Sequence, residues 1–186
     1  MKVEGTALPG VLLIEPKVFG DRRGYFFEAW NAERYREAGV DVAFVQDNLS
    51  FSERGVLRGL HCQHPHAQGK LVQVLDGEVF DVVVDIRRGS PTFGKSFCTY
   101  LSSENRCQLY VPAGFAHGFC VTSARALFSY KCTDLYHPAS EFTVLWNDPD
   151  LGIDWPAAEP SLSDKDLKGI RLRDLPSTRL PVFEVP

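Results

Sequence analysis

Short apolar runs separated by turn-forming residues recur along most of the chain, from Val11 to about Trp146. Gly, Pro, Asp, Asn and Ser stand between these runs, and each run has the length of a strand. A series of short strands with turn signals between them is typical of a β-sandwich, a jelly roll or a barrel. We expect strands within residues 11–14, 24–30, 71–75, 79–86, 97–101, 109–111, 119–122, 126–133 and 142–146.

Residues 79–87 show an alternation that gives a strand two different faces. The apolar face holds Phe80, Val82, Val84 and Ile86, and the mixed face holds Val79, Asp81, Val83, Asp85 and Arg87. From this segment alone we expect an ordinary strand with one solvated face. The alternative is a strand that lies between a packed core and a polar pocket or rim.

Helical signals are few. Residues 32–38 are predicted to form a helix, with Asn31 as its N-cap and Gly39 as its end. From Asp148 onwards the chain is rich in Pro and polar residues, so we expect turns and short helical pieces that wrap over the sheet. Ser163 is a candidate N-cap there, because two Asp residues follow in the first turn.

The composition is that of an ordinary globular protein. The chain has 186 residues, of which 44% are hydrophobic and 24% are charged, so it can bury a sizeable core. We expect one domain over residues 1–186. The formal net charge of −4 argues against a nucleic-acid partner, although a local basic pocket is compatible with it.

The cysteines and the apolar runs predict a reducing environment. The cysteine count is odd and no pair has Cys-x-x-Cys spacing, so we expect neither a disulfide framework nor a structural zinc site. Neither a signal peptide nor an apolar run of the ~20 residues that cross a bilayer is visible. We therefore expect a cytoplasmic protein with no membrane partner. The cysteines are Cys62, Cys98, Cys107, Cys120 and Cys132.

Two dense polar clusters, residues 58–70 and 110–119, carry the candidate chemistry. The second cluster contains the motif Pro-x-Gly-x-x-His, whose histidine is His117. The first cluster contains His64-x-His66. Together they resemble the two signature motifs of the cupin superfamily. The resemblance implies an all-β fold: a cupin-type jelly-roll barrel, with a short helix and an irregular C-terminal segment.

Lys70 stands where metal-binding cupins place a Glu ligand. An ammonium group repels a divalent cation, so we expect no metal at this site. A fixed cation can instead stabilise the enolate that forms when a carbon beside a carbonyl loses its proton. His61 is a candidate base for that proton. Inversion also needs an acid on the opposite face, and Tyr130 is a candidate for it.

Strict alternation would place Arg58 and His61 on opposite faces of one strand. Gly59 lies between them and is a candidate site for a bulge that turns both side chains inwards.

Nearly the whole chain also resembles the dTDP-4-dehydrorhamnose 3,5-epimerase family of sugar-nucleotide epimerases. Any one matching stretch could arise by chance, but so many in the same order over one domain are highly specific. The matching stretches are residues 19–26, 46–50, 57–61, 68–72, 85–87, 90–94, 112–119, 146–149, 155–156 and 162–166.

The resemblance implies a role for each matching residue. His61 corresponds to the general base, Asp166 to the carboxylate that orients it, Tyr130 to the general acid, and Lys70 to the residue beside the C4 oxygen. Tyr136 corresponds to the aromatic residue that stacks on thymine. The other nucleotide-sugar contacts correspond to Arg23, Glu28, Gln46, Asp47, Asn48, Arg58, His117, Glu141 and Lys165.

The family's substrate is a dTDP-4-keto-6-deoxyhexose, whose C4 ketone acidifies the protons on carbons 3 and 5. The resemblance implies inversion at both carbons without a cofactor or a metal, and a homodimer in which an N-terminal strand crosses to the partner. The chain departs from the common pattern at Cys62, which replaces an aromatic residue. His64 and His66 lie in a variable loop and are assigned no chemistry.

Three alternatives stay open at this point. A related enzyme could invert only carbon 3 with the same base and Lys70 but a repositioned acid. A metal-dependent cupin, such as an isomerase or a dioxygenase, would depend on the nearby histidines. A non-catalytic binding or storage cupin would not need a base, an acid and a paired carboxylate together.

Overall fold

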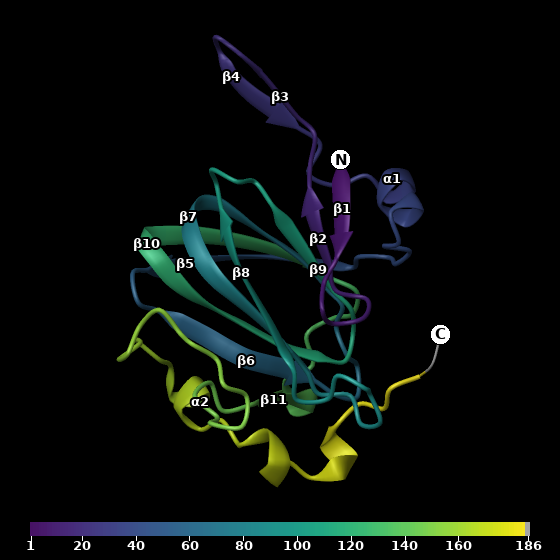
Figure 1. Ribbon diagram of the computed structural model, residues 1–186, viewed down its shortest axis with the longest axis vertical. Coiled ribbons are helices and arrows are strands. Elements are labelled where there is room, and N and C mark those ends of the chain that lie inside the picture. The colour runs from purple at the N-terminus through teal and green to yellow at the C-terminus, as the bar shows by residue number, and fades with distance from the viewer. Residues whose placement is uncertain (185–186) are drawn as a thin grey trace.

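The computed structural model describes residues 1–184, which form mainly antiparallel strands with short helices at the periphery (Figure 1). The strands are β1 (Lys2–Gly5), β2 (Leu12–Glu15), β3 (Val18–Asp21), β4 (Gly24–Phe27), β5 (Gln46–Glu53), β6 (Leu57–Gln63), β7 (Lys70–Asp85), β8 (Ser96–Ser102), β9 (Gln108–Val111), β10 (Phe115–Cys132) and β11 (Glu141–Thr143). The helices are α1 (Ala32–Glu37) and α2 (Asp164–Leu167), and the 3₁₀ turns are η1 (Pro138–Ser140), η2 (Leu172–Asp174) and η3 (Ser177–Arg179). No helix within residues 1–184 has the length and apolar character needed to cross a membrane.

Two long strands, β7 and β10, organise the fold. They pair from Phe115 opposite Asp85 to Cys132 opposite Lys70. One half of the pair carries β8 on one side and β6 with β11 on the other. The other half carries β9, β2 and β1 on one side and β5 on the other. The two antiparallel sheets therefore share their central strands, as expected for a jelly roll.

The expected division of these two strands is wrong. Residues 71–75 and 79–85 belong together in β7, and residues 119–122 and 126–132 belong together in β10. The pairing register shifts between Val121 and Ala126, where the strands pass from one sheet to the other. Gly77 lies at this bend with a φ of +82°, and a Cβ there would overlap the carbonyl oxygen of Arg125. Turn-forming residues inside a long strand thus mark a bend rather than an end.

Over residues 79–85 of β7 every residue except the half-buried Phe80 is buried, so the expected solvated face is also wrong. Val79 and Val83 pack in the core between the two sheets, and Asp81 is fully buried on the same face. On the other face, Val82 packs in a second core with Leu172 of the C-terminal segment. The mixed face is not solvated because it points into the space between the two sheets. The C-terminal segment, drawn in yellow-green in Figure 1, wraps over the apolar face instead, as its sequence predicted.

Both predicted helix starts are confirmed. Asn31 caps α1, because its side chain accepts a hydrogen bond from the backbone N–H of Arg34 at 3.1 Å. Gly39, with a φ of +96°, follows the end of this helix. Ser163 caps α2 in the same way, accepting from the backbone N–H of Asp166 at 3.2 Å. This cap fixes where the Asp166 carboxylate points.

The β3–β4 hairpin projects away from the barrel (Figure 1). Its aromatic side chains are largely uncovered: Phe19 and Tyr25 are each 55% exposed, and Phe26 is 68% exposed. A hairpin of two four-residue strands is marginally stable alone. The apolar surface of this hairpin is therefore suited to packing against another surface.

Candidate active site

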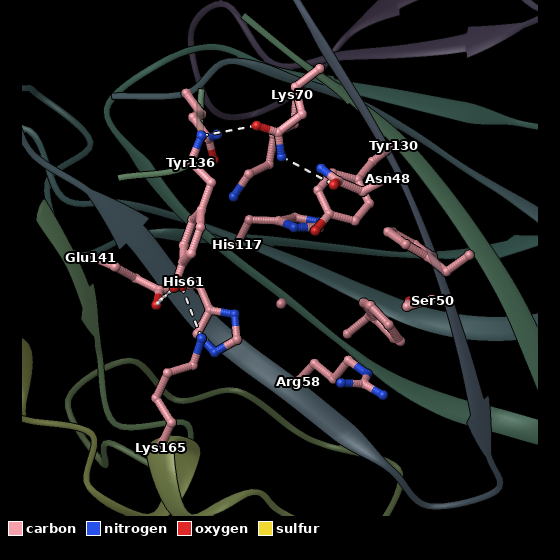
Figure 2. A pocket seen from close by; sticks show the side chains of 15 residues that line it. Asn48, Ser50, Arg58, His61, Lys70, His117, Tyr130, Tyr136, Glu141 and Lys165 are labelled. Atoms are coloured by element: carbon pink, nitrogen blue, oxygen red, sulfur yellow. Dashed lines mark hydrogen bonds and ion pairs between the residues drawn. The ribbon is translucent and has the colours of Figure 1, made fainter. Parts of the chain in front are cut away.

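A cavity of about 350 Å³ opens between the strands β5, β6, β7 and β10 (Figure 2), within the usual size range for a small-molecule site. Most of the residues predicted to act in catalysis or binding line it. They are Gln46, Asn48, Arg58, His61, Lys70, His117, Tyr130, Tyr136, Glu141 and Lys165. The cavity also has lining residues that were not predicted: Ser50, Gln68, Gly118, Phe119 and Phe128.

Alternation along β5 supplies one wall of the cavity. Gln46, Asn48 and Ser50 face inwards, and the Gln46 amide donates to Asn48 Oδ1 at 3.0 Å. Ser50 Oγ is buried without a hydrogen-bond partner, so it is available to a ligand. The same period-2 rule could have identified Ser50 from the sequence. It also explains why the predicted contact Asp47 lies outside the cavity, where it pairs with Lys131 at 2.9 Å.

The bulge expected at Gly59 is present. On β6 three steps separate Arg58 from His61, whereas their partners on β10, Phe119 and His117, are two steps apart. Gly59 has a φ of +137°, and a Cβ there would lie 2.6 Å from the Cα of Gly118. The extra residue turns Arg58 and His61 to the same side, and both line the cavity.

His61 and Asp166 form the closest titratable pair at this site. His61 Nε2 lies 2.6 Å from Asp166 Oδ1, and the Asp166 side chain is only 3% exposed. Asp166 also accepts hydrogen bonds from Ser163 Oγ at 2.6 Å and from the backbone N–H of Gly59 at 3.3 Å. Three donors thus converge on one buried carboxylate and hold it in place.

The protonation states of this pair follow from its surroundings. Burial raises the pKa of Asp166, but the hydrogen bonds from His61 and Ser163 outweigh it and bring the pKa to about 2. Burial lowers the pKa of His61, and the nearby charges of Lys165 and Lys70 lower it as well. The hydrogen bond to Asp166 raises the pKa but does not offset this lowering. Near neutral pH, Asp166 is therefore ionised and His61 is neutral. Since a carboxylate only accepts, Nε2 carries the ring proton and Nδ1 keeps a free lone pair that can accept a proton.

Charged side chains surround the free face of His61. Lys70 lines the cavity, and Lys165 donates to Glu141 Oε1 at 2.8 Å. Tyr136 donates its hydroxyl to Glu141 Oε2 at 2.9 Å (Figure 2). Burial raises the pKa of Glu141, but the hydrogen bonds from Lys165 and Tyr136 lower it by more. The pKa therefore lies below its ordinary value, and Glu141 is ionised. Two ammonium groups and one carboxylate thus face the same space.

Tyr130 and His117 reach the cavity from β10. Burial raises the pKa of Tyr130, which keeps the phenol protonated and able to donate a proton. His117 Nε2 lies 2.9 and 3.0 Å from the two carboxylate oxygens of Asp81, which is fully buried. Asp81 holds the ring of His117, as Asp166 holds that of His61.

The cavity does not collect every predicted contact. Arg23 is at the tip of the exposed hairpin and pairs with Asp21, and Glu28 pairs with Arg34 near α1. Neither lines the cavity of its own chain. Within residues 1–184, one group of three potential metal ligands has its ligand atoms within 4.8 Å of one another. This group also lies outside the cavity.

Known proteins match this chain over most of its length. The family model described as dTDP-4-dehydrorhamnose 3,5-epimerase matches residues 5–174. The dTDP-4-dehydrorhamnose 3,5-epimerase of Pseudomonas aeruginosa is 56% identical over 176 residues, covering 94% of this chain and 97% of that protein.

Solved structures are similar over the whole fold. That of the dTDP-6-deoxy-D-glucose-3,5-epimerase RmlC from Legionella pneumophila, in complex with dTDP-4-keto-L-rhamnose, has a TM-score of 0.96 and 52% identity and covers 99% of both chains. That of ChmJ, a 3'-monoepimerase from Streptomyces bikiniensis in complex with dTDP-quinovose, has a TM-score of 0.88 and 37% identity, covering 95% of this chain and 91% of that one. With a family model that spans most of its length and relatives at more than half identity, the chain belongs to the dTDP-4-dehydrorhamnose 3,5-epimerase family.

Proposed function

We propose that the protein inverts carbons 3 and 5 of dTDP-4-dehydro-6-deoxy-D-glucose to give dTDP-4-dehydro-L-rhamnose. The observation that carries this proposal is the carboxylate-held His61 in the same cavity as Lys70 and Tyr130. Double inversion is favoured because 3,5-epimerases match at 56% and 52% identity, whereas the 3'-monoepimerase matches at 37%.

The first half-reaction removes a proton beside the C4 ketone. Nδ1 of neutral His61 takes the proton from one face of the sugar, and the electron pair of the C–H bond moves onto the C4 oxygen. The Lys70 ammonium stabilises this oxyanion, which matters more in a partly dry cavity than in water. Asp166 stabilises the imidazolium that forms.

The second half-reaction returns a proton from the other side. Figure 2 shows Tyr130 and His61 entering the cavity from different sides. Tyr130 donates its hydroxyl proton to the carbon, the enolate collapses to the ketone, and the configuration is inverted. Tyr130 acts in this way for at least one of the two carbons. The imidazolium and the phenolate then exchange protons with solvent, and proton removal and return are repeated at the second carbon.

The rest of the cavity suits the nucleotide diphosphate. Arg58 and Lys165 provide positive charge for the pyrophosphate, in a protein whose formal net charge is −4. Tyr136 offers an aromatic face on which thymine can stack. Its backbone N–H donates to Gln46 Oε1 at 2.9 Å, which fixes the loop that carries it.

We further propose that the protein is a homodimer in which each β3–β4 hairpin packs against the partner. This accounts for the exposed Phe19, Tyr25 and Phe26, and it places Arg23 where it can complete the partner's site. Size-exclusion chromatography with light scattering should give twice the chain mass for the wild type. Phe26→Asp should give the monomer mass, and a monomeric wild type would refute the proposal.

Two further assignments belong to this proposal. The five free thiols favour a reducing, cytoplasmic location. The donor groups around the sugar are supplied by side chains, so we propose that turnover needs neither a cofactor nor a metal. Activity that is lost on chelation and restored by a divalent ion would contradict the second assignment and support a metal-dependent cupin.

The decisive experiment is incubation with dTDP-4-keto-6-deoxyglucose in deuterated water, followed by NMR. We expect deuterium at carbons 3 and 5 with inversion of both, because solvent exchange accompanies each proton return. Deuterium at carbon 3 alone would instead identify a 3-epimerase. No exchange at either carbon would identify a binding protein.

A further inference from the structure

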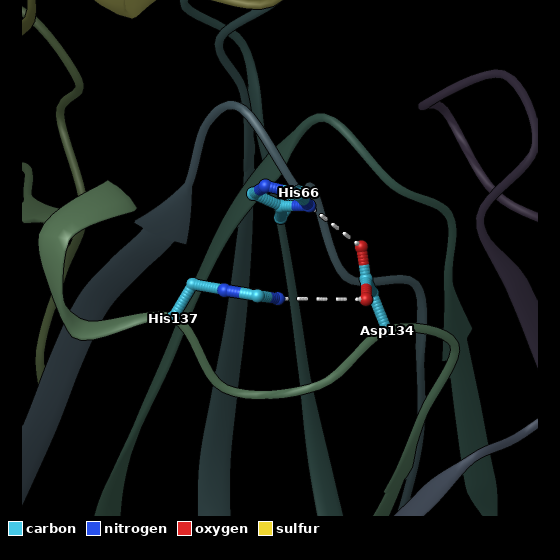
Figure 3. A group of neighbouring side chains, drawn as sticks. All are labelled: His66, Asp134 and His137. Atoms are coloured by element: carbon cyan, nitrogen blue, oxygen red, sulfur yellow. Dashed lines mark ion pairs between the residues drawn. The ribbon is translucent and has the colours of Figure 1, made fainter.

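Three potential metal ligands meet on the outer surface, on two loops that flank the cavity (Figure 3). His66 comes from the loop between β6 and β7, while Asp134 and His137 follow β10. His66 Nδ1 lies 3.5 Å from one oxygen of Asp134, and His137 Nε2 lies 3.9 Å from the other. The two imidazole rings stack with their centroids 4.0 Å apart, and each directs a nitrogen towards the carboxylate.

We propose that His66, Asp134 and His137 bind one divalent transition-metal ion. Their ligand atoms all lie within 4.8 Å of one another. A tetrahedral ion with bonds of roughly 2.0–2.1 Å holds its ligand atoms about 3.3–3.4 Å apart. Rotation of the exposed His66 ring and the partly exposed His137 ring would bring the three atoms to bonding distance of one ion.

The donor set selects the kind of ion. Two imidazole nitrogens with one carboxylate suit Zn²⁺, Ni²⁺ or Cu²⁺, whereas Mg²⁺ and Ca²⁺ prefer oxygen ligands alone. His66 is exposed and the other two side chains are partly exposed, so an ion can enter from solvent. Water or a small anion would complete the coordination on the open side.

A buried side chain holds the two loops in register beneath the cluster. The Gln63 amide, which is 4% exposed, donates to the backbone carbonyl of His66 and accepts from the backbone N–H of His137 at 2.7 Å. The Gln68 amide donates to the backbone carbonyl of Asp134 at 2.9 Å. All three ligands are thus anchored through their own backbones, which lowers the entropy cost of gathering them around an ion.

The position of the cluster suggests what an ion would do. Tyr136 lies directly before His137 and lines the cavity. An ion that ties His66 to His137 would stiffen the loop that carries Tyr136 and so affect nucleotide binding. This consequence rests on the proposed function, whereas ion binding itself does not.

The test is calorimetric titration of the metal-free full chain with Ni²⁺ and with Zn²⁺, in the absence of any nucleotide. We expect one ion per chain and a thermal midpoint that rises by several degrees at saturation. Co²⁺ should give a visible absorption band with the same stoichiometry. A wild type that shows no saturable binding of these ions would overturn the proposal, whatever its epimerase activity.

Variants locate the ion. The double substitution His66→Ala with His137→Ala should abolish the binding, and Asp134→Asn should weaken it by more than the roughly 10–100-fold seen for residues that only support a ligand. Asp134→Asn preserves side-chain volume and serves if the double variant does not fold. His64→Ala, on the same loop, is the matched control and should bind like the wild type. Unchanged binding in a folded double variant would place the ion elsewhere and refute the site.

Discussion

Asp166 lies 2.6 Å from Nε2 of His61, and this contact determines which ring nitrogen carries the proton. An ionised carboxylate accepts a hydrogen bond but cannot donate one, so the ring proton stays on Nε2 and the lone pair stays on Nδ1. Asn at position 166 can donate to Nε2 instead, which favours the tautomer with its proton on Nδ1.

Asp166→Asn should therefore lower kcat by about 10²–10⁴, the range for losing a general base. The loss should appear in kcat more than in KM, because Asp166 does not line the cavity. Asp164→Asn is the matched control, since Asp164 is exposed on the same helix. Equal activity of the two variants in a steady-state assay would show that Asp166 does not set the tautomer.

The acid limb of the pH profile should report His61. The pKa of this residue lies below its ordinary value of 6.5, and only neutral His61 can accept a proton. We therefore expect the midpoint of the acid limb of kcat/KM to lie below pH 6.5.

Lys165→Gln should move this acid limb to higher pH. The substitution removes a positive charge that lowers the pKa of His61 and leaves the Glu141 carboxylate without its ammonium partner. Both changes favour the imidazolium, so both raise the pKa of His61. Lys168→Gln, exposed beyond the end of α2, should leave the limb in place. A limb that stays fixed or moves to lower pH in Lys165→Gln would mean that another group titrates.

Lys70→Met should remove the charge that stabilises the enolate while keeping the length of the side chain. We expect kcat to fall by about 10²–10³, as for the loss of one donor to a developing oxyanion. Deuterium exchange at carbons 3 and 5 should fall in parallel, since proton removal itself becomes slow. The control is Lys131→Met, which removes a lysine that pairs with Asp47 outside the cavity. Exchange that continues at the wild-type rate in Lys70→Met would remove Lys70 from the mechanism.

Tyr130→Phe separates proton removal from proton return. His61 and Lys70 remain, so the enolate should still form, but the acid on the opposite face is lost. We expect deuterium to enter at a rate above that of inversion, with inversion lowered by about 10²–10⁴ for at least one carbon. Tyr110→Phe, a buried tyrosine of the barrel that does not line the cavity, is the control. Inversion and exchange that decline equally would argue against Tyr130 as the acid.

The family resemblance predicted much of the cavity wall, including Gln46 and Asn48. A local sequence rule predicted the bulge, from the glycine between Arg58 and His61. The period-2 rule applied to residues 46–50 would have added Ser50 and excluded Asp47.

Features that depend on distant segments could not be obtained this way. Asp166 meets His61 only because the C-terminal segment wraps over the barrel, and the same covering buries the outer face of β7. Without the family resemblance, nothing near Asp166 in the sequence points to a histidine. His66 and His137 are likewise brought together by the fold, so the sequence around His66 did not predict that it lies beside a second histidine.

The sequence did not predict the bend shared by β7 and β10, because a glycine between two apolar runs usually marks the end of a strand. The bend can be tested through the stability of glycine variants. Gly77 and Gly55 both have a left-handed φ, +82° and +77°. Gly55 has open space where a Cβ would be, whereas at Gly77 a Cβ would overlap the Arg125 carbonyl oxygen. Gly55→Ala should lower the free energy of unfolding by roughly 1–2 kcal/mol, the cost of a left-handed L-residue.

Gly77→Ala should cost more than Gly55→Ala, because the backbone of β10 must move away in addition to the conformational cost. Urea unfolding followed by circular dichroism measures both, and equal slopes against urea would show that the transitions are comparable. If the two variants lose the same stability, the bend tolerates a side chain and Gly77 is needed only for its dihedral angle. A larger loss for Gly77→Ala identifies the close approach of β7 and β10 as the contact that allows one pair of strands to serve both sheets.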